Sequence, residues 1–244
     1  MKLPLKENEI VALARRMDLS SVLMKRHIEE QIISLVDLSD EWHANALENF
    51  LKSEKISETD LSDWLKRKDW KKSDLALHLA RPEALYRFSK QRFGPGLEEN
   101  YLSNAANLDT VIYSLLRVKD PLLAKELWMR LCEKEVSFVE VAANYGEGPE
   151  AQRKGLIGPI AIGSLEPPAI RKILKALRPG EFTPPKKFGQ WHLLFRLEQI
   201  NPSSFDENMR DKLLTEELNK FIEHRSIALI NQEPVEPLHY DVES

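Results

Sequence analysis

The sequence has little of three features that would narrow its class at once: cysteine, long apolar runs and an excess of one charge. Its single cysteine, Cys132, excludes an internal disulfide and a cysteine metal cluster. We predict a buried helical position for it, with a reactive thiol as the alternative. No stretch is long enough to span a bilayer, and residues 1–16 lack a signal-peptide pattern. These absences predict a cytoplasmic protein without membrane insertion.

The charge balance excludes further classes of partner. A net charge of −4, with 42% apolar and 30% charged residues, is typical of an ordinary globular protein and predicts no nucleic-acid partner. His27, His43 and His78 lie on different predicted helices without an i, i+4 pair, so we predict no metal site. A length of 244 residues allows one large domain or two smaller ones.

Residues 1–107 are predicted to form an all-helical module. Apolar residues recur at helical spacing from Asp18 to Val36, and further helices are expected to begin near Ser39, Asp60 and Ser73, whose side chains can cap them. Pro82 is expected to kink or restart the fourth helix, because it has no amide proton.

Tryptophans are concentrated in this module. Trp42, Trp64 and Trp70 are most simply core residues. The alternative is a groove for a partner peptide, because several short amphipathic helices can leave an apolar channel between them.

Residues 108–202 follow a different pattern, in which short apolar or alternating runs alternate with helical spacing. The expected order is strand, helix, helix, strand, helix, strand, over the segments Asp109–Val118, Leu122–Lys134, Ser137–Ala142, Leu156–Ile160, Pro168–Leu177 and Gly189–Gln199. The fold class is therefore α+β, with a small antiparallel sheet flanked by helices. A final helix over 203–230 is expected to pack on the helical module, and residues 231–244 are predicted to form an extended tail.

A glycine-bearing loop, Tyr145 to Gly158, separates the first two of these helices from the next strand. Gly155-x-x-Gly158 is most simply a turn into that strand. Without a following Lys-Ser or Lys-Thr it is not a phosphate-binding loop.

The segment from Asp109 to Asn201 resembles a parvulin-type peptidyl-prolyl isomerase domain. The resemblance depends on the order and spacing of seven pieces, namely a first strand, a helix with Ala124 and Leu131, the Phe138-x-x-x-Ala142 helix, the Tyr145-Gly146-Glu147 loop, the Gly155-x-x-Gly158 turn, the Leu177-x-Pro179-Gly180-Glu181 turn and the His192 strand. The helices on either side resemble the arrangement of SurA-type chaperones, in which a C-terminal helix completes an N-terminal helical module around the parvulin domain.

This resemblance implies an isomerase that needs no metal or cofactor and lowers a rotation barrier of about 18 to 20 kcal/mol. Parvulins place two facing histidines, a loop cysteine or aspartate, and a Met/Leu and Phe wall at the site. His192 falls at the second histidine and Leu115 at the first. Gly148 falls at the loop residue, Leu165 at the Met/Leu wall and Ala169 at the phenylalanine.

Two interpretations follow from this incomplete match. In the first, Glu147 and His192 are catalytic, and Ile160 and Trp191 join Leu165 in the proline pocket. In the second, the domain only binds extended or proline-containing segments. Taken alone, His192 is also typical of a satisfied core histidine, and Glu147 of a solvated loop carboxylate.

The sequence therefore predicts a peptidyl-prolyl isomerase or peptide-binding chaperone whose clients are unfolded, proline-containing or leader-like polypeptides. The alternatives are a catalytically inactive parvulin-like binding protein, an export or maturation adaptor, and a purely structural helical scaffold.

Overall fold

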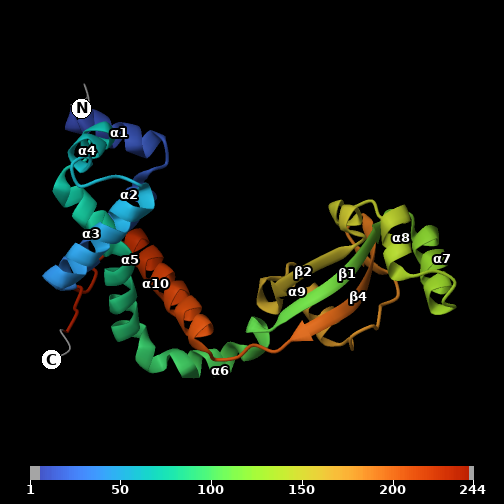
Figure 1. Cartoon of the computed structure of the whole chain (residues 1–244). Coiled ribbons are helices and arrows are strands. Elements are labelled where there is room, and N and C mark those ends of the chain that lie inside the picture. Colours follow the sequence, from blue (N-terminus) through green and yellow to red (C-terminus); the bar gives the residue numbers. More distant parts are fainter. Residues whose placement is uncertain (1–5, 242–244) are drawn as a thin grey trace. The chain divides into compact units, whose positions relative to one another are not determined.

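The computed structural model describes residues 6–241, which form two compact units (Figure 1). The first unit contains both ends of the chain, up to Glu99 and from Asp206 onward. The second unit is Asn100–Phe205. Each unit has a hydrophobic core of its own.

The first unit is helical, as the sequence predicted. Its elements are α1 (Glu7–Arg16), α2 (Ser20–Leu35), α3 (Asp40–Glu54), α4 (Leu61–Lys68), α5 (Lys72–Phe93), the 3-10 turn η1 (Gly94–Gly96), the start of α6 (Leu97–Leu108) and α10 (Glu207–Ile230). The core lies where α2, α5 and α10 meet, with Ile28, Phe88 and Ile222 buried together. The predicted return of the last helix to this unit is confirmed.

Two of the three predicted helix caps differ from the structure. Ser39 caps α3 as expected, accepting a hydrogen bond from the Trp42 amide at 3.2 Å. Asp60 precedes α4 but makes no side-chain cap. The helix α5 begins at Lys72 rather than after Ser73, because the Asp74 carboxylate accepts a hydrogen bond from the Lys71 amide at 2.8 Å.

Of the two effects expected at Pro82, a kink or a restart of the helix, the restart does not occur. Helix α5 continues through Pro82 to Phe93. Ala80 and Ala84, on either side of the proline, are buried in the core, and this packing offsets the hydrogen bond that proline cannot make.

The tryptophans of this unit pack against other aromatic rings. Trp64 lies edge-on to Phe50 at 5.2 Å and to Trp70 at 5.8 Å between ring centroids. The sequence also allowed a peptide groove between these helices. A mostly apolar cavity of about 390 Å³ does open between α3, α4 and α5. It is lined by Asp40, His43, Leu47, Leu61, Lys72, Leu75, Ala76 and Leu79.

The second unit is the predicted α+β domain. Its four-stranded antiparallel sheet has the order β2-β1-β4-β3. The strands are β1 (Thr110–Val118), β2 (Leu156–Ala161), β3 (Lys186–Phe188) and β4 (Trp191–Asn201). Helices α7 (Pro121–Cys132) and α8 (Phe138–Tyr145) contribute to the core on one face, and α9 (Pro168–Lys175) to the core on the other. Two short 3-10 turns, η2 (Pro149–Arg153) and η3 (Ile162–Ser164), connect these elements.

The border between the units lies inside α6, not at the predicted 107/108 position. Tyr101 explains the difference, because its hydroxyl donates to the Ser203 carbonyl at 2.8 Å and its ring lies 5.1 Å from Phe205. These contacts tie the second half of α6 to the segment that precedes α10. The second border therefore lies after Phe205 rather than at the predicted 202/203 position.

Cys132 is exposed, so its predicted burial is wrong. It is the last residue of α7, one position after Leu131, which faces the core. Among the described residues, no helix is long and apolar enough to cross a membrane.

Candidate functional site

The glycine-bearing loop is fixed to strand β1 at both of its ends. The Glu147 amide donates to the Arg117 carbonyl at 2.9 Å, and the Leu115 amide donates to the Gly155 carbonyl at 2.9 Å. The loop therefore lies along the C-terminal end of β1, and residues of both segments form one site there.

A buried ion pair lies at the centre of this site. The Glu150 carboxylate accepts hydrogen bonds from Nε of Arg117 at 3.0 Å and from Nη2 at 3.4 Å. The side chain of Glu150 is only 6% exposed and that of Arg117 31% exposed. Such a two-point contact fixes the guanidinium plane as well as the charge.

Gly148 makes room for this carboxylate. A Cβ atom at position 148 would lie 2.2 Å from Oε1 of Glu150. The space in which a side chain at position 148 would begin is therefore filled by the acid two residues further along. The sequence interpretation missed Glu150 and Arg117, although an arginine in an apolar strand and an acid after Gly148-Pro149 were visible signals.

Tyr113 lies in the same strand and is 5% exposed. Burial raises the pKa of its hydroxyl above the ordinary tyrosine value, the negative charge of Glu150 raises it further, and Arg117 opposes this. The hydroxyl therefore keeps its proton at neutral pH.

Trp191 forms the apolar wall of the site. The Arg117 guanidinium carbon lies 5.7 Å from the centre of its ring, and Nζ of Lys119 lies 5.1 Å from it. Both contacts are cation–π interactions with the Trp191 ring, which orient the two cationic side chains.

Glu147 and His192 converge on the backbone of Lys119. Its amide donates to Oε1 of Glu147 at 2.8 Å, and its carbonyl lies 3.1 Å from Nδ1 of His192. Both predicted catalytic residues therefore position the turn that follows β1.

We expect Glu147→Ala to lower the free energy of unfolding by about 1 kcal/mol, because the Lys119 amide loses its acceptor. Glu147→Gln keeps an oxygen in the same place and should lose less than half of that. Urea denaturation of the full chain measures both variants. Equal losses for the two variants would contradict the positioning role.

The resemblance implied that His192 and Leu115 face each other, but in the structure they do not. Leu115 is paired with Phe195, whereas His192 is paired with Val118. Successive side chains of a strand point to opposite faces, so Leu115 lies on the α9 face and His192 on the face of α7 and α8.

The predicted proline pocket is only partly assembled. Leu115 and Leu165 belong to one core cluster on the α9 face, and Ile160 and Trp191 pack against it. Leu115 is 5% exposed and Leu165 is 3% exposed, so both are core residues rather than accessible walls. Ala169 is exposed on α9 and is not in this cluster.

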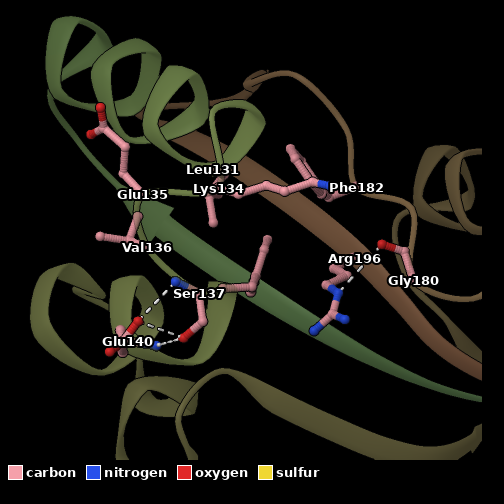
Figure 2. A pocket seen from close by; sticks show the side chains of 10 residues that line it. Leu131, Lys134, Glu135, Val136, Ser137, Glu140, Gly180, Phe182 and Arg196 are labelled. Carbon is pink, nitrogen blue, oxygen red and sulfur yellow. Dashed lines mark hydrogen bonds between the residues drawn. The ribbon is translucent and has the colours of Figure 1, made fainter.

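A separate cavity of about 370 Å³ lies near the junction of α7 and α8, and none of the predicted site residues lines it (Figure 2). Its polar groups are engaged locally. The Glu140 carboxylate accepts hydrogen bonds from the Ser137 amide and hydroxyl, both at 2.8 Å, and these lower its pKa. Nε of Arg196 donates to the Gly180 carbonyl at 3.4 Å. The capping box of α8 explains the contacts between Ser137 and Glu140 without a ligand.

Residues 122–199 match the family described as rotamase, PPIC-type PPIASE domain. This part of the chain is therefore a PPIC-type, or parvulin-type, peptidyl-prolyl isomerase domain. Strand β1, with Tyr113, Leu115 and Arg117, lies just before the matched range.

Two solved structures are similar to nearly the whole chain. The peptidylprolyl isomerase PrsA from Bacillus cereus is 16% identical, with a TM-score of 0.52 over 96% of this chain and 90% of that chain. The peptidylprolyl isomerase PrsA from Bacillus anthracis is 14% identical, with a TM-score of 0.50 over 88% of this chain and 100% of that chain. At these identities the likeness shows the fold alone, a helical module joined to a PPIC-type domain. No curated protein sequence matches the chain.

Proposed function

We propose that the chain is a peptidyl-prolyl isomerase that also binds its clients as a chaperone, and that these clients are unfolded or leader-like polypeptides. The PPIC-type domain and the attached helical module support this proposal. The polypeptide clients follow from the chemistry, since the substrate of a prolyl isomerase is an X-Pro bond. The cytoplasmic location stays a prediction.

The observation that carries the proposal is the Arg117–Glu150 pair beside Trp191. In a planar X-Pro amide the nitrogen lone pair is delocalised into the carbonyl, whereas in the twisted amide it is free to accept a hydrogen bond. A fixed N–H donor at this nitrogen therefore stabilises the transition state more than either planar form. Nη1 of Arg117 takes no part in the pair with Glu150 and supplies such a donor.

In this mechanism the remaining groups position the donor and the substrate. The Glu150 carboxylate holds the guanidinium in one orientation, and Tyr113 remains protonated beside it. The Trp191 ring offers a flat apolar surface for the proline ring. Glu147 and His192 act on the site through Lys119. No covalent bond forms or breaks, so the residues act by binding and electrostatics alone.

A prolyl isomerisation assay on a panel of X-Pro peptides tests this mechanism, against an uncatalysed exchange of tens to hundreds of seconds. We expect Arg117→Lys, which keeps the charge but loses the two-point contact, to lower kcat/KM by about 100-fold. Glu147→Ala and His192→Ala should lower it less than about 10-fold, because they act indirectly. Arg130→Lys is the control, since Arg130 is 33% exposed and pairs with exposed carboxylates. Full activity of Arg117→Lys would reject the assigned donor.

The second candidate is a parvulin-like protein that binds without isomerising. This candidate is favoured by position 115, where the resemblance to parvulins places the first histidine. The residue there is Leu115, which is paired with Phe195 in the neighbouring strand, and both side chains are buried. In that case the chain suppresses aggregation of an unfolded protein while every X-Pro peptide exchanges at its uncatalysed rate. An accelerated rate on any peptide of the panel excludes this candidate.

A further inference from the structure

The segment after α10 is not a free tail. Residues 233–241 contain no helix or strand and lie within the helical unit, next to α5 (Figure 1). Leu238 and Tyr240 pack against the core cluster of α2, α5 and α10. The tail therefore has an apolar anchor on this unit.

The side chains of α5 and α10 that hydrogen-bond the tail contact its main chain. Nε2 of Gln91 donates to the Asp241 carbonyl at 2.5 Å, and the Asp241 amide donates to Oε1 of Gln91 at 3.0 Å. Nη1 of Arg225 donates to the Glu236 carbonyl at 2.7 Å. One side-chain amide thus binds both backbone groups of a residue, as a neighbouring strand would. Hydrogen bonds to the main chain do not depend on which side chains the bound segment carries.

Charge and composition define the kind of segment that lies here. The helices contribute the guanidinium groups of Arg92 and Arg225, and these two charges lie close enough that Arg92 helps burial to lower the pKa of Arg225. The tail brings three carboxylates and two X-Pro bonds, with Glu233, Pro234, Glu236, Pro237 and Asp241. An acidic, proline-containing segment is therefore complementary to this surface.

The tail fills its groove incompletely. A cavity of about 270 Å³ remains between α5, α10 and the tail, lined by Phe221 and Ala228 on α10 and by Val235 and Pro237 on the tail. Nε of Arg225 is buried and has no hydrogen-bond partner within the described part of the chain. A segment with a larger side chain or an additional acceptor at this point would fill the cavity and satisfy that donor.

We propose that the groove between α5 and α10 is a binding site for extended, acidic and proline-containing polypeptide segments, and that residues 233–241 are its internal, displaceable occupant. The identification of such segments with clients rests on the function proposed above. The tail competes in cis at an effective concentration of about millimolar, so the groove binds an external segment strongly only when the tail is weakened or outcompeted.

The test measures binding of a fluorescent peptide with the sequence of residues 233–241 to the full chain. The double substitution Leu238→Ser, Tyr240→Ser removes the apolar anchor and should tighten binding of this peptide at least tenfold. His239→Ser is the matched control, because His239 lies between the two anchors and is exposed. We call the chain with Leu238→Ser and Tyr240→Ser the released chain. Adding Gln91→Ala to it should weaken peptide binding again at least fivefold.

Equal affinity of the native and the released chain, or affinity that is insensitive to Gln91→Ala, would overturn the proposal. Hydrogen exchange on the native chain gives a second readout that needs no substitution at the anchors. A saturating peptide should speed exchange of the amides of residues 238–241, and unchanged exchange would also overturn it. Because the probe is the tail's own sequence, these results do not depend on isomerase activity, and a negative X-Pro assay leaves them standing.

Discussion

Arg117→Met should lower the free energy of opening the PPIC-type unit by about 3 kcal/mol, the largest loss expected from one side chain of the site. The substitution leaves the Glu150 carboxylate only 6% exposed and without its cation. Removing one partner of a buried pair costs more than the pair contributes, because the remaining charge stays away from water. Amide hydrogen exchange in β4, where Leu194 is fully buried, measures this opening separately from the helical unit.

Arg130→Met is the matched control for that substitution. Arg130 is 33% exposed, close to the 31% of Arg117, but its partners Glu126 and Glu135 are 60% and 54% exposed. Losing an exposed pair should change the opening free energy by less than about 0.5 kcal/mol. If the two arginine variants lose the same amount, burial of Glu150 is not what makes the pair important.

Gly155→Ala should lower the opening free energy of the same unit by about 3 to 4 kcal/mol. Gly155 has a φ of +82°, and an added Cβ would lie 2.8 Å from the Leu115 carbonyl oxygen and 2.7 Å from Cβ of Ala142. Two effects therefore add, namely the backbone conformation and the contact with a strand that cannot yield. The loop is expected to detach from β1, because the Leu115 amide donates to the Gly155 carbonyl.

Gly180→Ala separates these two effects. Gly180 has a φ of +89°, but an added Cβ would meet no atom within 4 Å. We expect a loss of about 1 to 2 kcal/mol, which reports the conformational cost alone. The difference between the two alanine variants then measures the close approach of the loop to β1 and α8. A difference near zero would contradict the tight contact at Gly155.

Arg117→Met and Gly155→Ala, each with its control, test the same contact between the loop and β1. Gly148 and Gly155 let the loop approach β1, and that approach brings Glu150 to Arg117. A weakened loop should therefore also lower isomerase activity, if Arg117 is the donor. Gly155→Ala at a temperature where the unit stays folded provides this comparison.

The order of elements could be predicted because it depends on local patterns. Helical spacing predicted α2, a cap at Ser39 predicted the start of α3, a short β-branched and apolar run predicted β1, and alternating apolar residues predicted β4. The resemblance to parvulins depended in turn on turns and spacings that are read directly from the chain, and the family match over residues 122–199 confirms it.

The candidate site could be predicted only in outline. The sequence located the loop and named Gly148, Glu147 and Trp191 as residues of interest, and all three lie at or beside the site that the structure forms. The resemblance implied that positions 115 and 192 face each other, and the structure does not pair them, because facing pairs depend on strand register. His192 and Leu115 lie on opposite faces of the sheet, which no spacing within either strand reveals.

The sequence by itself therefore predicted most of the helices and three of the four strands in their order, since these follow from propensity and periodicity within a few residues. Its turns and spacings carried the resemblance of the second unit to parvulins, whereas α1 and the short strand β3 were not predicted. Only the tertiary structure decided which charges meet. Arg117 and Glu150 are 33 positions apart, and their pairing depends on the loop lying against β1. The same holds for Gln91 and Asp241, 150 positions apart, whose contact turns an apparent tail into the occupant of a groove.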